Sequence, residues 1–243
     1  MHGIGNDFAI FDMRKSPSNL TTSTIKTLSH RQLGIGCDQL ILLKSSNTAD
    51  CEMEIYNQDG SKSSACGNAT RCVSMLIGKK NSTIKIGSKL LKTQYFNDKK
   101  ISVNMVQITK APTKMKFKNI EGYSTDVGNP HLVFFVEDFN FNIQEIGSYF
   151  ENHKKFPNKI NVNFAKVLND KTIELKVWER GTGATLACGT GACATQYVAN
   201  YFELTKPKAT VKQAGGNLEI EIKNNEIIMT GSATKVFDGV IEV

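Results

Sequence analysis

Two of the six cysteines stand in the same local setting. The segments Cys66–Asn68 and Cys188–Thr190 both continue from Cys-Gly through a small polar residue into an apolar run that is typical of a buried helix. The first N–H groups of a helix lack intrahelical partners, so they and the helix dipole stabilise an anion. We therefore expect each thiol to ionise more readily, and the neighbouring N–H groups to bind a carboxylate.

The surroundings of these cysteines repeat along the chain. Residue 188 lies 122 positions after residue 66 (188 minus 66), and four landmarks recur in one order at an offset of 122 or 123. These are Ser64–Gly67 with Leu186–Gly189, Ile55–Asn57 with Val177–Glu179, Gln39 with Asn161, and Gly5–Asn6 with Gly128–Asn129. The repetition predicts two similar lobes, and a pseudo-twofold arrangement of them would place Cys66 and Cys188 on opposite walls of one cleft.

Two thiols on either side of one carbon suit the inversion of a stereocentre next to a carboxylate. One thiolate removes the proton from one face while the opposite thiol delivers a proton to the other face. The N–H dipoles that hold the carboxylate would also stabilise the carbanion-like intermediate. Because this chemistry requires no metal or bound cofactor, we predict that the protein uses none.

The elements that must position these residues are mostly strands. Short runs rich in β-branched and aromatic residues recur at 8–12, 39–44, 52–56, 83–87, 90–95, 101–107, 131–137, 172–178, 217–222 and 226–230. Helical patterns are fewer and cover 21–32, 67–78, 143–154 and 189–202. The pattern predicts a strand-rich fold that mixes α and β elements.

Composition excludes several classes of protein. With 243 residues, 40% of them hydrophobic and 22% charged, the chain has enough apolar material for a core and is not collagen-like, coiled-coil or disordered. The sequence shows neither a membrane span nor a secretory signal, so we expect a soluble, cytoplasmic protein that binds no membrane. Four of the 30 basic residues are Arg, which leaves 26 Lys behind the net charge of +7. Scattered lysines without interleaved aromatic residues argue against nucleic-acid binding.

Other readings of the cysteines carry less weight. The close pairs have C-x5-C and C-x4-C spacing, which does not match a structural zinc site. Gly189–Ala194 fits a loose G-x-G-x-x-A dinucleotide pattern, but ten residues separate it from the preceding strand. A redox switch, in which Cys66 pairs with Cys188 or Cys72, remains an alternative.

Seven blocks in order along the chain resemble the diaminopimelate epimerase family. They are Met1–Phe8, Gly34–Gln39, Asn57–Ser61, Ala65–Cys72, Gly128–His131, Asn161–Phe164 and Glu179–Gly191. The resemblance implies a cofactor-independent two-base epimerase that interconverts LL- and meso-diaminopimelate, on the route to lysine and peptidoglycan, with Cys66 and Cys188 as the catalytic acid/base pair. A related two-cysteine racemase of the proline or hydroxyproline type is the alternative.

The resemblance also assigns further site residues. His131 and Glu179 would assist the thiols, and Arg180 would bind the distal carboxylate of the substrate. The residues that it implies for substrate binding are Asn6, Gln39, Asn57, Gly67, Asn68, Asn129, Asn161, Glu179, Arg180, Gly189 and Thr190.

For the architecture, the resemblance implies two pseudo-symmetric α/β lobes, each a strand-rich roll or barrel around a central helix, and a homodimer. The first lobe would comprise 1–111 and a C-terminal strand, 232–243, that returns to it. The second lobe would comprise 112–231.

Overall fold

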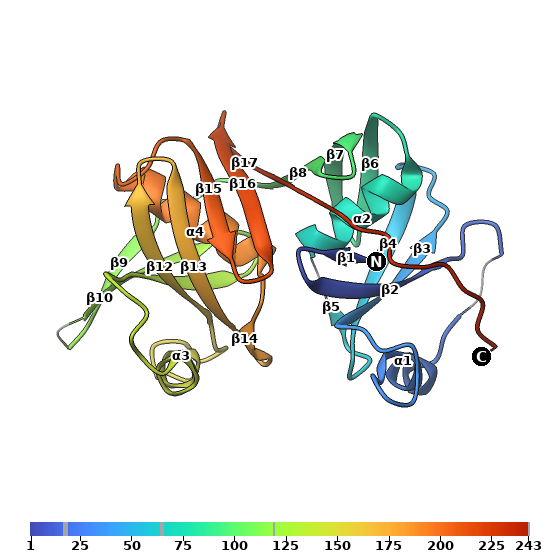
Figure 1. The fold of residues 1–243 in the computed structure, drawn as a ribbon, viewed down its shortest axis with the longest axis horizontal. Coiled ribbons are helices and arrows are strands. Elements are labelled where there is room, and N and C mark those ends of the chain that lie inside the picture. The colour runs from blue at the N-terminus through green and yellow to red at the C-terminus, as the bar shows by residue number, and fades with distance from the viewer. Residues whose placement is uncertain (17–18, 64–65, 119, 243) are drawn as a thin grey trace. The chain divides into compact units, whose positions relative to one another are not determined.

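The computed structural model describes residues 1–16, 19–63, 66–118 and 120–242, and it divides the chain into two compact units. Unit 1 comprises Met1–Val103 with Gly231–Val243, and unit 2 comprises Asn104–Thr230. Both mix helices with a larger share of strands, which confirms the predicted fold class (Figure 1). The lobe limits drawn from the sequence, at 111 and 232, stay a prediction.

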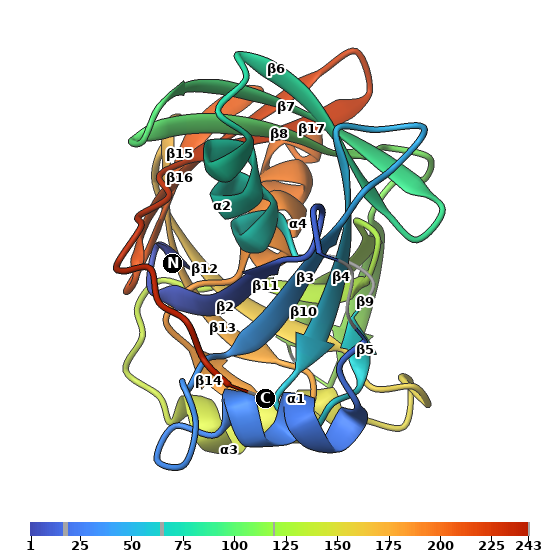
Figure 2. The ribbon, with the colours of Figure 1, turned by 90° about the vertical axis from the view of Figure 1, so that its right-hand side faces the viewer.

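Unit 1 is a set of strands with two helices. Its elements are β1 (His2–Gly3), β2 (Asn6–Asp12), α1 (Thr22–Ser29), β3 (Gln39–Lys44), β4 (Cys51–Asn57), β5 (Lys62–Ser63), α2 (Gly67–Ile77), β6 (Asn81–Ile86), β7 (Lys89–Asn97) and β8 (Lys100–Gln107), the last of which runs on into unit 2. Strand β2 is parallel to β3, β3 is antiparallel to β4, and β4 is parallel to β6. Helix α1 lies at one end of these strands (Figure 2).

Helix α2 runs through the middle of unit 1. All residues from Gly67 to Ser74 are buried, and the helix contacts β1, β6 and β7 (Figure 2). It begins after Cys66 and ends at Gly78, whose positive φ of 69° is the left-handed conformation that glycine adopts without strain. Burial on all sides explains why small residues occupy its first turns.

Unit 2 repeats this arrangement. Its elements are β9 (Thr113–Phe117), β10 (Ile120–Asp126), β11 (Pro130–Phe135), α3 (Ile143–Glu151), β12 (Asn161–Asn169), β13 (Thr172–Glu179), β14 (Gly183–Thr185), α4 (Gly189–Tyr201), β15 (Lys208–Gln213), β16 (Gly216–Lys223) and β17 (Glu226–Gly231). Helix α4 is buried from Gly191 to Ala199 and contacts strands β10 to β13, β15 and β16. Helix α3 packs through Phe150 onto an aromatic core with Phe117, Phe134 and Phe164.

The two units share one pairing order and one register. Strand β11 is parallel to β12, β12 is antiparallel to β13, and β13 is parallel to β15, as for β2, β3, β4 and β6. The pair Leu40 and Tyr56 corresponds to Val162 and Trp178, and the pair Ile55 and Ser63 to Val177 and Thr185. Each partner is shifted by 122 positions (162 minus 40, 185 minus 63), which confirms the predicted duplication.

The C-terminal segment from Gly231 groups with unit 1, where Thr234 forms an isolated bridge with His2. Arg71, which is fully buried in α2, donates from Nε to the carbonyl oxygen of Ser232 at 3.0 Å. The other residues from 232 to 242 form no strand, and Val243 lies outside the described residues.

Membrane insertion by a helix finds no support in the described part of the chain. Every helix there is too short or too polar to cross a bilayer.

Candidate active site

Cys66 is the N-cap of α2. Its backbone is extended (φ −153°, ψ 100°), and its Sγ accepts a hydrogen bond from the backbone N–H of Ala69 at 3.5 Å. The S–H group also donates toward Asn6 Oδ1 at 3.7 Å. The sulfur therefore lies at the positive end of a buried helix, where a thiolate is stabilised. Ser64 and Ala65, which belong to the predicted repeat, lie outside the described residues.

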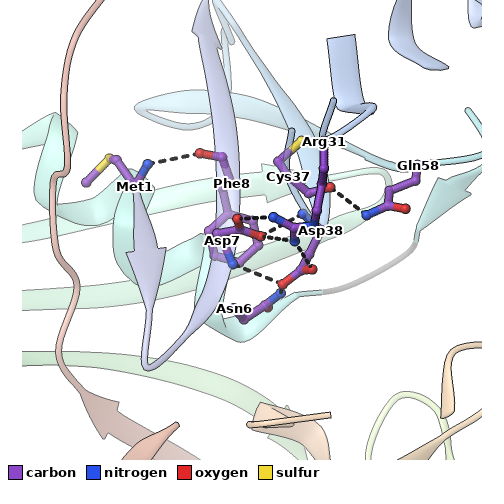
Figure 3. A network of polar contacts seen from close by, with 8 residues as sticks. All are labelled: Met1, Asn6, Asp7, Phe8, Arg31, Cys37, Asp38 and Gln58. Carbon is purple, nitrogen blue, oxygen red and sulfur yellow. Dashed lines mark hydrogen bonds and ion pairs between the residues drawn. The ribbon is translucent and has the colours of Figure 1, made fainter. Parts of the chain in front are cut away.

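A charged cluster fixes the side chain of Asn6, as Figure 3 shows. Arg31 binds both oxygens of Asp7, at 2.8 and 2.9 Å, and Asp38 Oδ1 at 2.7 Å. Asp38 Oδ2 accepts from Asn6 Nδ2 at 2.8 Å. A carboxylate only accepts, so the amide of Asn6 must turn its oxygen away from Asp38, toward Cys66 and the donating Nδ2 of Asn68.

A second polar pair of unit 1 joins Gln39 and Asn57. These residues are opposite each other in the β3–β4 pair, and Gln39 Nε2 donates to Asn57 Oδ1 at 3.0 Å. Asn57 Nδ2 in turn donates to Ser61 Oγ at 3.0 Å. Asn6 and Asn68 thus contact each other beside the Cys66 thiol, while Gln39 and Asn57 form a pair that continues to Ser61.

Cys188 is the N-cap of α4 and is 4% exposed. Its Sγ accepts from the backbone N–H of Gly191 at 3.3 Å and lies 3.5 Å from Thr190 Oγ1, and its own N–H donates to Gln213 Oε1 at 2.8 Å. Burial, together with the charge of the neighbouring Glu179, raises the pKa of this thiol well above its usual value. Hydrogen bonds from Thr190 and Gly191 act in the opposite direction.

His131 is fully buried beside this site. Its Nε2 lies 3.1 Å from Asn129 Oδ1, and Asn129 Nδ2 donates to Thr190 Oγ1 at 3.3 Å. On the other side of the ring, Nδ1 lies 3.0 Å from Asn163 Nδ2. Burial lowers the pKa of His131 to about 3, and the positive charge of Arg180 adds to this effect, so the imidazole is neutral near pH 7.

Glu179 is the last residue of β13, and Arg180 begins the turn that follows. Glu179 Oε1 accepts from Thr185 Oγ1 at 2.6 Å. The backbone N–H of Arg180 donates to Asn161 Oδ1 at 3.0 Å, and its exposed guanidinium donates to the carbonyl of Asn158 at 3.1 Å. Asn161 thus binds the backbone of this turn, while the Arg180 side chain reaches the surface of the unit.

Four residues with a clear part in this geometry are absent from the sequence-based site. Asp38 orients Asn6, Asn163 contacts His131, Gln213 holds the backbone of Cys188, and Glu151 accepts from the N–H of Gly181 at 3.0 Å. Asp38 and Asn163 lie inside the blocks Gly34–Gln39 and Asn161–Phe164, which is the signal that could have found them.

Comparison with known proteins shows to which family this chain belongs. The sequence model described as "Diaminopimelate epimerase" matches residues 1–111 and 123–236. The chain belongs to the diaminopimelate epimerase family. It is 40% identical to the diaminopimelate epimerase of Sphingopyxis alaskensis, over 98% of this chain and 94% of that protein. It is also 40% identical to the diaminopimelate epimerase of Pelagibacter ubique, over 97% and 95% of the two chains.

Solved structures show that the fold of this diaminopimelate epimerase family member is shared more widely. A PhzF-family phenazine biosynthesis protein of Bacillus anthracis aligns with a TM-score of 0.68 at 17% identity, over 96% of this chain and 92% of that chain. A hydroxyproline epimerase of Agrobacterium vitis, with bound trans-4-hydroxy-L-proline, aligns with a TM-score of 0.68 at 14% identity, over 95% and 87%. At these identities the likeness concerns the fold alone.

Proposed function

We propose that the chain is a cofactor-independent isomerase that interconverts LL- and meso-diaminopimelate, with Cys66 and Cys188 as its acid/base pair. The observation that carries the proposal is the family match across nearly the whole chain, which includes both Cys-Gly helix starts. Each cysteine is an N-cap whose sulfur accepts a backbone N–H, and this is the local setting that the chemistry requires.

In the proposed reaction, one sulfur acts as a thiolate and removes the proton from the α-carbon next to a carboxylate. The other sulfur, as a thiol, donates a proton to the opposite face, and the stereocentre is inverted. The two sulfurs exchange protonation states during each turnover, so the reverse reaction uses them in exchanged roles. Electron density on the intermediate passes into the carboxylate, whose charge the helix N–H groups stabilise.

Substrate binding follows the same division of roles. The reacting carboxylate would bind the N–H groups of the two helix starts, and Arg180 would bind the distal carboxylate. Glu179 and the neutral His131 would adjust the protonation of Cys188. The proposed substrate-binding set is Asn6, Gln39, Asn57, Gly67, Asn68, Asn129, Asn161, Glu179, Arg180, Gly189 and Thr190.

The testing experiment is turnover of LL-diaminopimelate in deuterium oxide with reductant present. Deuterium should appear at the inverted carbon of the meso product, because the proton that is delivered comes from a solvent-exchanged thiol. Cys66→Ala and Cys188→Ala should each lower turnover by at least about 10²-fold, whereas Cys51→Ala, at a buried thiol of β4, should retain it. Undiminished turnover in both site variants would reject the mechanism.

A second candidate is racemisation of a proline-type substrate, which the fold of the Agrobacterium vitis hydroxyproline epimerase favours. The two substrates differ in the distal carboxylate. Arg180→Ala should therefore raise KM for diaminopimelate, and wild-type enzyme should leave proline and hydroxyproline unchanged. Activity on hydroxyproline that is insensitive to Arg180→Ala would favour the second candidate.

We also propose that the protein forms a homodimer, as the resemblance implies. Sedimentation of the full chain at several concentrations tests this, and a monomer at all of them would contradict it.

A further inference from the structure

Asn163 is a fully buried polar residue in β12 that the proposed mechanism leaves without a role. Its Nδ2 lies 3.0 Å from His131 Nδ1 and donates to the backbone carbonyl oxygen of Leu132 at 3.3 Å. Its Oδ1 has no hydrogen-bond partner among the described residues. Buried amide oxygens are normally paired, so this arrangement needs a reason.

The carbonyl of Leu132 decides the orientation of the Asn163 amide. A backbone carbonyl only accepts hydrogen bonds, so the NH₂ group must face it, and the reverse orientation would set two oxygens against each other. The second N–H of the same NH₂ group points to His131 Nδ1. Nδ1 must therefore accept, and the single proton of the neutral imidazole is on Nε2.

From Nε2, the hydrogen bonds run in one direction to the sulfur. Nε2–H donates to Asn129 Oδ1, and the amide of Asn129 then presents Nδ2 to Thr190 Oγ1. Since Thr190 Oγ1 accepts from Asn129, its own hydrogen is available for Cys188 Sγ, 3.5 Å away. An O–H donor stabilises the thiolate form of Cys188.

We propose that Asn163 is a positioning residue that holds neutral His131 in its Nε2–H tautomer and so directs a hydrogen-bond chain through Asn129 and Thr190 onto Cys188. The effect of these hydrogen bonds on catalysis rests on the proposed function, but the tautomer of His131 does not. Two charged side chains also act on this network: Arg180 lowers the pKa of His131, and Glu179 raises the pKa of Cys188, against the effect of the donors Thr190 and Gly191.

The tautomer can be read directly in the wild-type protein. Nitrogen-15 NMR of enzyme labelled in its histidine rings distinguishes protonated from unprotonated nitrogens, and His131→Gln assigns the signal. We expect His131 to show a protonated Nε2 and an unprotonated Nδ1 near pH 7. A protonated Nδ1 would overturn the inference, whatever the enzyme's activity.

Variants test whether Asn163 controls the tautomer of His131. Asn163→Leu should give a mixture of the two His131 tautomers and lower kcat about threefold to tenfold, the size of one hydrogen bond, with little change in KM. The matched control Gln196→Leu removes another fully buried amide, which donates to the carbonyl of Lys206, and should leave the His131 signals unchanged. A pure Nε2–H tautomer in folded Asn163→Leu would refute the role of Asn163.

A double variant tests whether the chain acts as one unit. Thr190→Val keeps the backbone N–H and removes the final O–H donor, so its kcat loss should not multiply with that of Asn163→Leu. Independent, multiplying losses would show that the chain does not act through Thr190. If instead Cys66→Ala and Cys188→Ala both leave turnover intact, the proposed function fails while the tautomer result stands.

Discussion

Trp178 Nε1 donates a 2.7 Å hydrogen bond to Glu151 Oε2, while Glu151 Oε1 accepts the backbone N–H of Gly181. The last residue of α3 thus binds the residues on both sides of Glu179 and Arg180, where β13 ends and the next turn begins. Burial raises the pKa of Glu151, but these hydrogen bonds and Lys159 lower it on balance, so the residue is a carboxylate near neutral pH.

Glu151→Gln should therefore loosen this turn. An amide replaces one accepting oxygen with a donor, which leaves either Trp178 Nε1 or the N–H of Gly181 without a partner. We expect a loss of about 1–3 kcal/mol in unfolding free energy and a raised KM, because Arg180 is less well positioned. Denaturant midpoints and steady-state kinetics measure both, with exposed Glu145→Gln as the control on the same helix. Equal stability of the two variants would show that the hydrogen bonds of Glu151 do not stabilise this turn.

The buried His131 should make stability dependent on pH. Its folded pKa of about 3 lies below the ordinary value, so between these values the unfolded chain binds a proton that the folded chain excludes. Unfolding free energy should then fall as pH drops below about 6.5, by about 1.4 kcal/mol per pH unit from this group. His131→Gln should weaken the pH dependence of the urea midpoint between pH 7 and pH 5, whereas His153→Gln should not. A slope unchanged by His131→Gln would mean that the imidazole is not excluded from protonation.

Gly191 should not tolerate a side chain. A Cβ there would lie 2.6 Å from Asn163 Oδ1 and 3.3 Å from Cys188 Sγ. Gly191→Ala should therefore lose about 1–3 kcal/mol of stability through overpacking, although alanine favours helices, and turnover should fall. Adding Asn163→Ala removes the clashing oxygen and should restore part of the thermal stability without restoring turnover. A stabilised single variant would show that the first turn of α4 can move.

Asp38 should affect turnover through Asn6. In Asp38→Asn, an NH₂ group replaces one of the carboxylate oxygens that accept hydrogen bonds, among them those from Asn6 Nδ2 and the N–H of Asp7. The Asn6 amide then loses its fixed orientation beside Cys66. We expect about threefold to tenfold lower kcat with little change in stability, because the ion pairs with Arg31 are exposed. Asp12→Asn, which breaks the similar pair with Arg14, is the kinetic control. Equal kcat in both variants would show that Asp38 does not position Asn6.

Much of the fold follows from local sequence pattern. The helices at 67–77 and 189–201 begin where the Cys-Gly segments predict, and the repeat of short landmarks matches the shared register of the two units. Strand β12 is absent from the predicted strands because Asn161 and Asn163 are poor strand formers. Both residues instead use their amides on groups that the pairings of β12 with β11 and β13 bring near: Asn161 on Pro130 and Arg180, and Asn163 on His131.

The positioning residues are harder to predict for a related reason. Glu151 acts on a turn 30 residues away in sequence, and Gln213 acts on Cys188 from 25 residues away. Neither lies in a motif, since Gly181 and Cys188 receive these contacts through backbone N–H groups, which every residue except proline supplies. Such contacts depend on how α3 and β15 pack, which a single sequence does not reveal.

The register common to both units also shows where the chain accepts a change of length. Strand β6 begins at Asn81 and β15 at Lys208, an offset of 127 (208 minus 81), whereas β3 to β5 and β12 to β14 keep an offset of 122. The additional residues are confined to α4 and the turn that follows it. A one-residue insertion within a paired strand would reverse every inward side chain after it. The stretch between Ile77 and Asn81 is therefore the natural place to graft a tag or loop into unit 1.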